Sequence, residues 1–358
     1  MHFLKKAIKI IFSFCIYYLR LDALLYRCIK KSGTTVLLYH SVNPSTIVPN
    51  AVGLCISPKR FERHIRYLAK RCNIIPISEM VACLENNKPL PANSVAITLD
   101  DGFGDNFKYA FPILKKYRSS ALIFLISDII NTSRLPWLLE FYQRMRFAGA
   151  KHLSIDLAKA VPAANDVFGT EREIDLPLVT SGQRCKATLE LRKILKKLPE
   201  VPRQQLLSAI YEKITLDQNS VQSDNFRMLS WDEIRSMRQH GIEFGAHSRN
   251  HANLLKFSEA DLWDELIISK QRIEENLKEA VTTFAFPGYA STNKSPEVDA
   301  LLKRAGYRGC MSDVNLVDGI NGSTTNPFDI RRIEILEPTF MLAGELVYYR
   351  FFRDYIKK

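Results

Sequence analysis

Short apolar runs alternate with amphipathic stretches along most of this 358-residue chain. Residues 35–40 (TVLLYH), 95–99 (VAITL) and 121–126 (ALIFLI) have the length and apolar character of buried strands. The helix-like segments between them carry apolar residues three or four positions apart, as helices packed on a sheet do. The alternation predicts a parallel α/β sheet or barrel that begins near residue 35.

Helix starts are marked by capping residues. Ser57 precedes Pro58, a proline suited to the first helical position, and the helix continues through Phe61. Ser230 followed by Glu233 forms a capping box, and Ser258 opens a further helix that is expected to run to about residue 278. Further strands are expected at 242–245, 282–286, 307–311 and 330–335.

The rhythm of strands and helices breaks between about residues 131 and 226. This stretch contains the charged helical run 189–198 and the polar segment 217–225, with little strand pattern. We interpret it as a mostly helical insertion, since surface loops accept long insertions at small cost in stability.

The first 31 residues are strongly basic. They carry seven lysines and arginines and a single acid, Asp22. Their net charge of +6 is half of the chain's net charge of +12. Residues 10–19 (IIFSFCIYYL) form an apolar run too short to cross a membrane alone. Three interpretations stay open: a helix lying on an anionic membrane surface, a signal sequence, or a helix packed on the domain. No nucleic-acid-binding signature accompanies the charge.

The seven cysteines are scattered and include no Cys-x-x-Cys pair. This pattern disfavours a disulfide framework or a zinc ribbon and favours buried, reduced thiols.

Two adjacent carboxylates, Asp100 and Asp101, follow the second apolar run, with Gly102 directly behind them. In enzymes with a parallel α/β barrel, the catalytic side chains lie at the carboxyl ends of the strands. One carboxylate can hold a metal while its neighbour stays free as a base. Taken alone, the same three residues would also suit an ordinary turn.

His247 and His251 follow the strand expected at 242–245. A spacing of four would place both imidazoles on one face of a helical turn, close enough to share a cation. With Asp101 they would form a site of two histidines and one carboxylate. Zinc is the first expectation for a divalent metal there, although cobalt or iron suits the same ligands.

These residues resemble the motifs of the polysaccharide deacetylase family, also called NodB homology or carbohydrate esterase family 4. Residues 98–102 (TLDDG) are similar to the family's T-F-D-D-G motif, and 247–251 (HSRNH) fits H-[ST]-x-x-H. Residues 284–289 (FAFPGY) are similar to its third motif. The resemblance covers roughly residues 35–130 and 227–336. It implies a distorted (β/α) barrel interrupted by the insertion.

The resemblance also implies roles for individual residues. Asp101, His247 and His251 would hold the metal, and Asp100 would be the catalytic base. The third motif would face the substrate, and the N–H of Gly288 would help to stabilise an oxyanion. The residues expected to bind substrate are Phe286, Pro287, Gly288 and Tyr289.

This chain departs from the family pattern in three places. Gly288 and Tyr289 stand where the family usually has Tyr and Gly. Ala285 replaces an arginine that orients the base in some members, and Arg331 or Arg332 is a candidate substitute. No histidine follows His251, so the late histidine that many members use as general acid is missing.

His40 is the candidate replacement for the missing acid. It ends the first expected strand in a Tyr-His element, where its imidazole would reach the leaving amine. A histidine packed between strands is the alternative.

The sequence therefore predicts a metal-dependent hydrolase that removes N-acetyl groups from a polysaccharide or lipid-linked saccharide in surface-glycan metabolism. The alternatives are a catalytically impaired sugar-binding barrel, and an esterase or amidase acting on a non-sugar acyl group. We expect a basic N-terminal segment over residues 1–34, a barrel over 35–340 and a C-terminal helix over 341–358. The expected location is a bacterial-type cell envelope, at the membrane or its cytoplasmic face.

Overall fold

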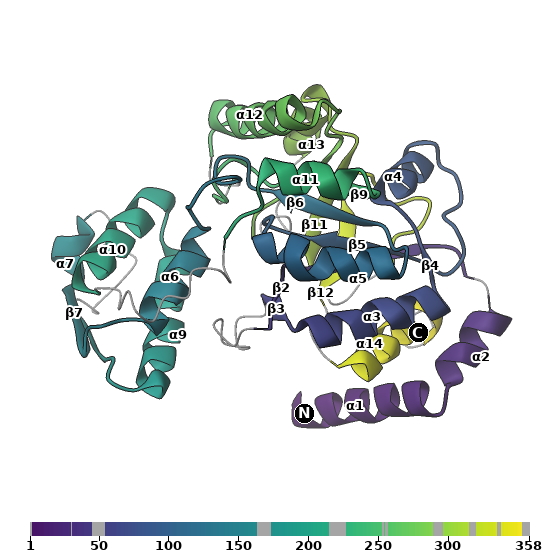
Figure 1. The fold of residues 1–358 in the computed structure, drawn as a ribbon, viewed down its shortest axis with the longest axis horizontal. Helices are drawn as coiled ribbons and strands as arrows, with labels where there is room; N and C mark the ends of the chain where they lie inside the picture. Colours follow the sequence, from purple (N-terminus) through teal and green to yellow (C-terminus); the bar gives the residue numbers. More distant parts are fainter. Residues whose placement is uncertain are drawn as a thin grey trace. The chain divides into compact units, whose positions relative to one another are not determined.

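Seven parallel strands close into a barrel in the larger of the two units into which the chain divides (Figure 1). The structure is a computed structural model, and it describes residues 2–29, 31–44, 54–162, 173–214, 227–252, 254, 257–288, 296–314, 320–334 and 338–352. The larger unit comprises residues 1–44, 53–133 and 227–358, and the smaller one comprises 45–52 and 134–226.

The barrel strands are joined by parallel pairing throughout, and the pairing of β1 with β5 closes the ring. In order around the ring they are β1 (Thr34–Tyr39), β12 (Ile330–Glu334), β11 (Gly309–Val314), β10 (Thr283–Ala285), β9 (Ile242–Ala246), β6 (Ala121–Leu125) and β5 (Ser94–Leu99). A short strand, β4 (Asn73–Ile74), also pairs with β5. Because all seven strands are parallel, their carboxyl ends meet at one rim, which we call the mouth, and their amino ends form the base.

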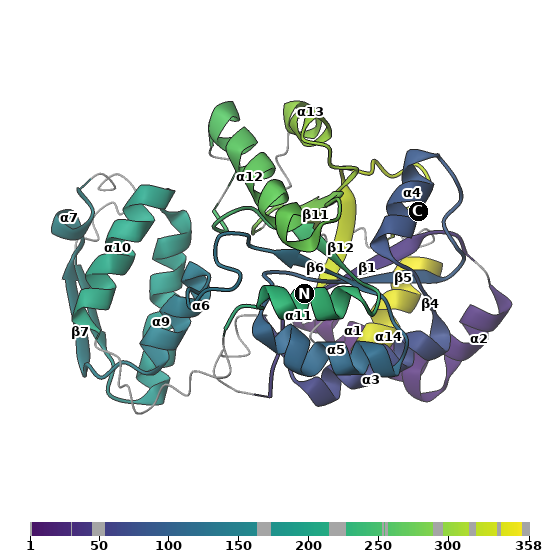
Figure 2. The ribbon, with the colours of Figure 1, turned by 45° about the horizontal axis from the view of Figure 1, so that its top comes forward.

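Helices surround the barrel, as Figures 1 and 2 show. They include α3 (Pro58–Arg71), α5 (Phe111–Lys116), α11 (Trp231–Arg238), α12 (Glu259–Leu277) and α13 (Pro296–Arg304). A π-helical turn, Asn106–Ala110, leads into α5. The caps expected from sequence are confirmed: the side chains of Ser57, Ser230 and Ser258 accept hydrogen bonds from the backbone at the starts of α3, α11 and α12. The (β/α) barrel predicted from the sequence is thus confirmed.

A further helix, α4 (Ile77–Glu85), packs its buried face against residues of the barrel strands. Met80 and Val81 share one apolar cluster with Val36, Ala96 and other strand residues. The start of α4 is capped by Glu243 of β9, whose carboxylate accepts from the backbone N–H groups of Ile77 and Ser78. These contacts fix the helix to the strands that carry the site.

The barrel wall is tightly packed just before the His pair. A Cβ added to Gly245 would lie 2.6 Å from the Phe124 ring and 2.7 Å from Thr283 Oγ1. Only glycine fits there without a shift of neighbouring atoms.

The base of the barrel buries an arginine from the C-terminal segment. Arg350 lies in a π-helical turn, Tyr348–Phe352, that follows α14 (Thr339–Val347). Its terminal nitrogens donate to the carbonyls of Gly33 and Ser94, 3.2 and 2.8 Å away, and to Thr35 Oγ1. The guanidinium therefore ties the end of the chain to the first residues of β1 and β5.

The two N-terminal helices, α1 (His2–Tyr18) and α2 (Leu21–Cys28), pack on this C-terminal segment. Ile16 and Tyr26 form a cluster with Val347 and Phe351. Within the described residues, no helix is long and apolar enough to span a membrane.

The smaller unit combines helices with one antiparallel strand pair. Its helices are α6 (Trp137–Arg146), α7 (Leu157–Ala160), α9 (Ser181–Lys197) and α10 (Glu200–Lys213), and its strands are β7 (His152–Asp156) and β8 (Glu173–Pro177). The sequence pattern did not predict this strand pair. In the larger unit, β2 (Ser41–Val42) and β3 (Cys55–Ile56) form another short pair.

Candidate metal centre at the barrel mouth

Asp100 and Asp101 lie directly after β5 at the mouth, and both are buried. The backbone N–H of Asp100 donates to the carbonyl of Tyr39 at 2.9 Å, which continues the β1–β5 ladder by one step. Asp101 then takes a left-handed conformation (φ 76°), and Gly102 follows with φ 78°. Consecutive residues of a straight strand would point to opposite faces, whereas this turn lets both carboxylates approach His247 Nε2, at 3.8 Å from Asp100 and 3.5 Å from Asp101.

The candidate ligands predicted from sequence come together. Ligand atoms of Asp101, His247 and His251 all lie within 4.8 Å of one another. Asp101 Oδ1 is 3.3 Å from His251 Nε2 and 3.5 Å from His247 Nε2. Three ligands on one side leave other positions free for water and substrate, which is the arrangement of catalytic metal sites.

His247 is held in the tautomer that a metal needs. Its Nδ1 donates to the carbonyl of Ala285 at 2.8 Å, so the lone pair of Nε2 faces Asp101. Burial lowers the pKa of His247 to about 4, against a raising effect of Asp100. The ring is therefore neutral at pH 7, the state in which imidazole binds metals.

The expectation of a helical turn between the two histidines is wrong. Residues 247–251 form a loop in which Ser248 and His251 both adopt left-handed conformations, with φ of 62° and 60°. The backbone N–H of His251 donates to Ser248 Oγ at 3.0 Å and closes the loop on itself. The imidazoles meet, with ring centroids 5.1 Å apart, because of this loop and not because of helical periodicity.

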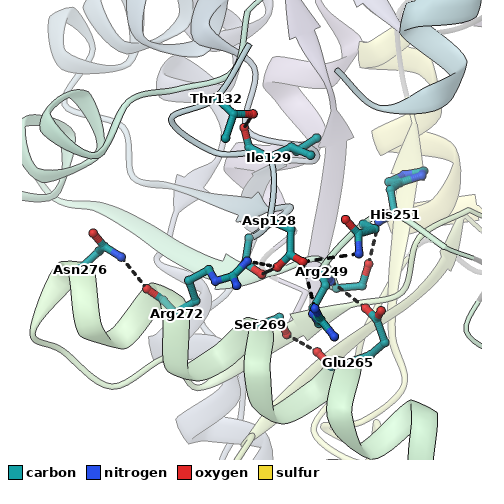
Figure 3. A network of polar contacts seen from close by, with 12 residues as sticks. Asp128, Ile129, Thr132, Arg249, His251, Glu265, Ser269, Arg272 and Asn276 are labelled. Carbon is teal, nitrogen blue, oxygen red and sulfur yellow. Dashed lines mark hydrogen bonds and ion pairs between the residues drawn. The ribbon is translucent and has the colours of Figure 1, made fainter. Parts of the chain in front are cut away.

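A network of charged groups supports the loop (Figure 3). Asp128, just after β6, accepts from the guanidinium of Arg249 at 3.2 Å and from that of Arg272 on α12. Glu265, also on α12, accepts from the backbone N–H of Arg249 at 2.8 Å. Neither acid was singled out from the sequence, because each becomes meaningful only when β6, α12 and the loop are brought together.

Asp100 is paired with Arg332 of β12 through two parallel hydrogen bonds of 2.7 and 2.9 Å. Burial alone would raise the pKa of Asp100, but the positive charge of Arg332 and the hydrogen bonds that it donates outweigh burial and lower the pKa. Of the two candidates for the missing arginine, Arg332 and not Arg331 occupies the place beside Asp100. Arg331 instead donates its backbone N–H to Asn321.

His40 stands at the same rim, after β1, and its Nδ1 lies 3.5 Å from Glu334 Oε1. Glu334 was not predicted as a site residue. It is two residues from Arg332 on β12, so both side chains lie on one face of the strand, and this alternation was the available signal.

Another buried acid, Asp105, supports the segment after His40. Asp105 accepts hydrogen bonds from Ser41, from the backbone N–H of Val42 and from Asn43. Asn106 donates to the carbonyl of His40 at 2.9 Å. Burial raises the pKa of Asp105 to about 6 despite these donors.

The third motif begins in β10, where the carbonyl of Ala285 holds His247, and continues past the end of the strand. Phe286 and Pro287 are buried, whereas Gly288 is exposed and left-handed (φ 69°). Tyr289 lies outside the described residues.

The donor set fits a divalent metal. Asp101 Oδ1 is buried without a hydrogen-bond partner, although two imidazole nitrogens face it. A buried carboxylate oxygen left in this way is costly unless a cation completes it. Nitrogen and oxygen ligands in this combination suit zinc, and cobalt or iron as well.

A closed parallel barrel with this cluster at its mouth is the architecture of NodB-type deacetylase barrels. Residues 210–310 match the family model described as polysaccharide deacetylase. A putative polysaccharide deacetylase of Bacillus subtilis, YxkH, is 32% identical over 104 residues, which are 28% of this chain and 35% of that protein. The resemblance inferred from the motifs is thereby confirmed, and the match spans about a third of the length of this curated relative.

Solved structures agree on the fold. The deacetylase PplD of Streptococcus pyogenes, in complex with acetate, aligns with 89% of this chain and 99% of its own (TM-score 0.54, 17% identity). IcaB from Ammonifex degensii aligns with 88% of this chain and 98% of its own (TM-score 0.55, 18% identity). BC0361, a polysaccharide deacetylase from Bacillus cereus, aligns with 88% of this chain and 69% of its own (TM-score 0.52, 15% identity).

Proposed function

We propose that this chain is a metal-dependent hydrolase that removes N-acetyl groups from a polysaccharide or lipid-linked saccharide. One observation carries the proposal: Asp101, His247 and His251 converge at the mouth, and Asp100 lies beside them, held by Arg332. A substrate assembled at a bacterial-type cell envelope, as in surface-glycan metabolism, suits the basic N-terminal helices.

Asp101, His247 and His251 would hold the metal, most simply Zn²⁺. A divalent ion there supplies Lewis-acid polarisation of the acetamide carbonyl and lowers the pKa of a water molecule. Asp100 removes the proton of the attacking water, and Arg332 keeps its carboxylate ionised and fixed in direction. The N–H of Gly288, in the third motif, would donate to the developing oxyanion.

His40 donates a proton to the leaving amine. Glu334 Oε1, 3.5 Å from Nδ1, orients the ring and leaves Nε2 to face the substrate. The side chain of Asn106, next to Asp105, donates to the carbonyl of His40 and keeps the backbone there in place.

The metal is tested first. Purified wild-type protein is expected to contain about one equivalent of a divalent metal by elemental analysis, and Asp101→Ala is expected to lose it. Metal-free wild-type protein that also fails to take up zinc would overturn the proposal.

The chemistry is tested next, by acetate release from N-acetylglucosamine oligomers. His40→Ala should lower kcat by about 10²-fold or more while the metal content stays unchanged. Near-wild-type activity of this variant would remove His40 from the acid role.

Two other functions remain as outcomes of these assays. Metal binding and oligosaccharide binding without acetate release would indicate a catalytically impaired sugar-binding barrel, which the altered third motif favours. Acetate release only from small acyl esters or non-sugar amides would indicate an esterase or amidase.

A further inference from the structure

The outer face of α1 and α2 is the main exposed apolar surface of the described residues. Of the eleven large hydrophobic side chains that are exposed among all the described residues, nine lie between residues 8 and 29. Ile8, Ile11, Phe14 and Tyr18 follow one another at three- and four-residue spacing, so they form a stripe along α1. Leu19, Leu21, Leu24 and Ile29 continue the exposed apolar surface into α2 and beyond its end.

This stripe is held in a fixed orientation by the opposite face of α1. Ser13 and Ile16 are buried against the C-terminal segment. The approach of α1 to α14 is so close that a Cβ at Gly344 would overlap the side chain of Ser13. Edge-to-face ring contacts join Phe12 to Tyr348 and Phe352. The helix therefore holds its apolar stripe on the side away from α14, and Figure 1 shows α1 beside α14 at the edge of the larger unit.

The charged side chains that the first two helices expose are basic. Lys9, Arg20 and Arg27 are exposed. The only acid of residues 1–31, Asp22, is buried and pairs with Arg71 at 3.0 Å. Glu345 of α14 pairs with Lys9. The first helices thus offer apolar side chains and basic groups together, with no acidic group of their own at the surface.

We propose that the outer face of α1 and α2 docks on an anionic lipid bilayer and lies in the plane of its interface. The apolar stripe inserts among the acyl chains, and the basic side chains contact anionic headgroups. A second copy of the chain fits this face poorly, because two such surfaces would bring like charges together. This proposal is independent of the chemistry at the mouth.

Geometry favours docking over crossing. The helix α1 has 17 residues and would extend about 25 Å, which is less than the hydrocarbon core of a bilayer. Its buried face already packs on α14, so only one side is free for lipid.

Vesicle co-sedimentation of the full chain tests the proposal. Wild-type protein is expected to sediment with vesicles of phosphatidylcholine mixed with phosphatidylglycerol, and to do so less with pure phosphatidylcholine or at high salt. The double variant Ile11→Ser/Phe14→Ser should bind the anionic vesicles about 10-fold more weakly or worse. Arg20→Asn/Arg27→Gln should weaken binding to anionic vesicles and not to neutral ones; asparagine tolerates the left-handed conformation of residue 20 (φ 56°).

The matched control is Val179→Ser/Val201→Ser, which removes two equally exposed apolar side chains from the smaller unit. It should bind vesicles as the wild type does. Thermal unfolding and acetate release from soluble oligomers should be the same for all variants, which separates loss of docking from loss of folding or of the proposed activity. Absence of wild-type binding, or equal binding by the Ile11/Phe14 variant, overturns the proposal. If the wild type does not bind vesicles but forms a dimer in sedimentation equilibrium, and the Ile11/Phe14 variant is a monomer, the face would be assigned to a second copy instead.

Discussion

The barrel buries an arginine at each end, and the two ends use it in different ways. At the base, the terminal nitrogens of Arg350 donate to backbone carbonyls and a threonine hydroxyl, and these partners cannot change their protonation state near neutral pH. At the mouth, Arg332 is paired with the carboxylate of Asp100, beside Asp101 Oδ1, which has no hydrogen-bond partner. At the base, the arginine joins parts of the fold through their backbone carbonyls. At the mouth, the arginine keeps an acid ionised beside the candidate metal ligands.

The largest effect is expected from the carboxylate at the mouth. Asp100→Asn keeps the shape of the side chain and removes the base, so kcat for acetate release should fall by about 10²–10⁴-fold. The metal content should stay at the wild-type level, since Asp101 and not Asp100 is the expected ligand. A loss smaller than tenfold would mean that another group takes the water proton.

Arg350→Met is expected to act on stability alone. The carbonyls of Gly33 and Ser94 would lose their buried donors, and the free energy of unfolding should fall by about 3 kcal/mol. Urea denaturation measures this loss, and kcat per folded molecule should not change. A large drop in kcat with unchanged stability would contradict the division between base and mouth.

The mouth should also respond to acid in a way that the base does not. The pKa of His247 in the metal-free fold is about 4, below its ordinary value of 6.5, so the fold favours the neutral ring. Its contribution to stability is therefore complete above pH 6.5 and is lost as the pH falls through 4. Metal-free protein should lose up to about 3 kcal/mol of unfolding free energy over this window.

His247→Asn is the control for this loss, because its amide can still donate to Ala285. The variant should show a flatter dependence of stability on pH between 6.5 and 4. An unchanged slope would assign the acid sensitivity to other groups.

Arg332→Met makes the same substitution at the mouth, and it should lower kcat/KM by about 10–100-fold at pH 7. Arg332 lowers the pKa of Asp100 against the raising effect of burial, so its removal should raise that pKa. The acidic limb of the kcat/KM profile should then move to higher pH, and Arg332→Lys should restore it in part. If kcat/KM decreases at every pH and the acidic limb stays at the same pH, Arg332 has only a packing role.

Much of the barrel could be predicted from the sequence because its signals are local. Apolar runs placed β1, β5 and β6 within a residue or so, and serine caps placed the starts of α3, α11 and α12. Closure of the ring by β1 and β5 is a long-range pairing, and no local pattern carries it.

The site was predicted only as far as its motifs reach. The three candidate ligands meet as expected, yet the helical turn expected between the histidines is a loop. Spacing alone could not reveal this, because Ser248 and His251 hold left-handed conformations with support from α12 and β6. Arg332 and not Arg331 reaches Asp100 because its side chain lies on the face of β12 that is turned toward this acid. The register between β12 and β1 sets that orientation.

The tight packing at Gly245 bears on how substitutions in this chain should be interpreted. Any side chain there would collide with Phe124 and Thr283, two residues before His247. In a saturation mutagenesis screen scored by growth, this position would be as intolerant as a metal ligand, although glycine has no side chain to bind a metal. Scoring cellular abundance beside activity separates the two: variants of Gly245 should disappear from the soluble pool, whereas variants of Asp100 should remain abundant and inactive.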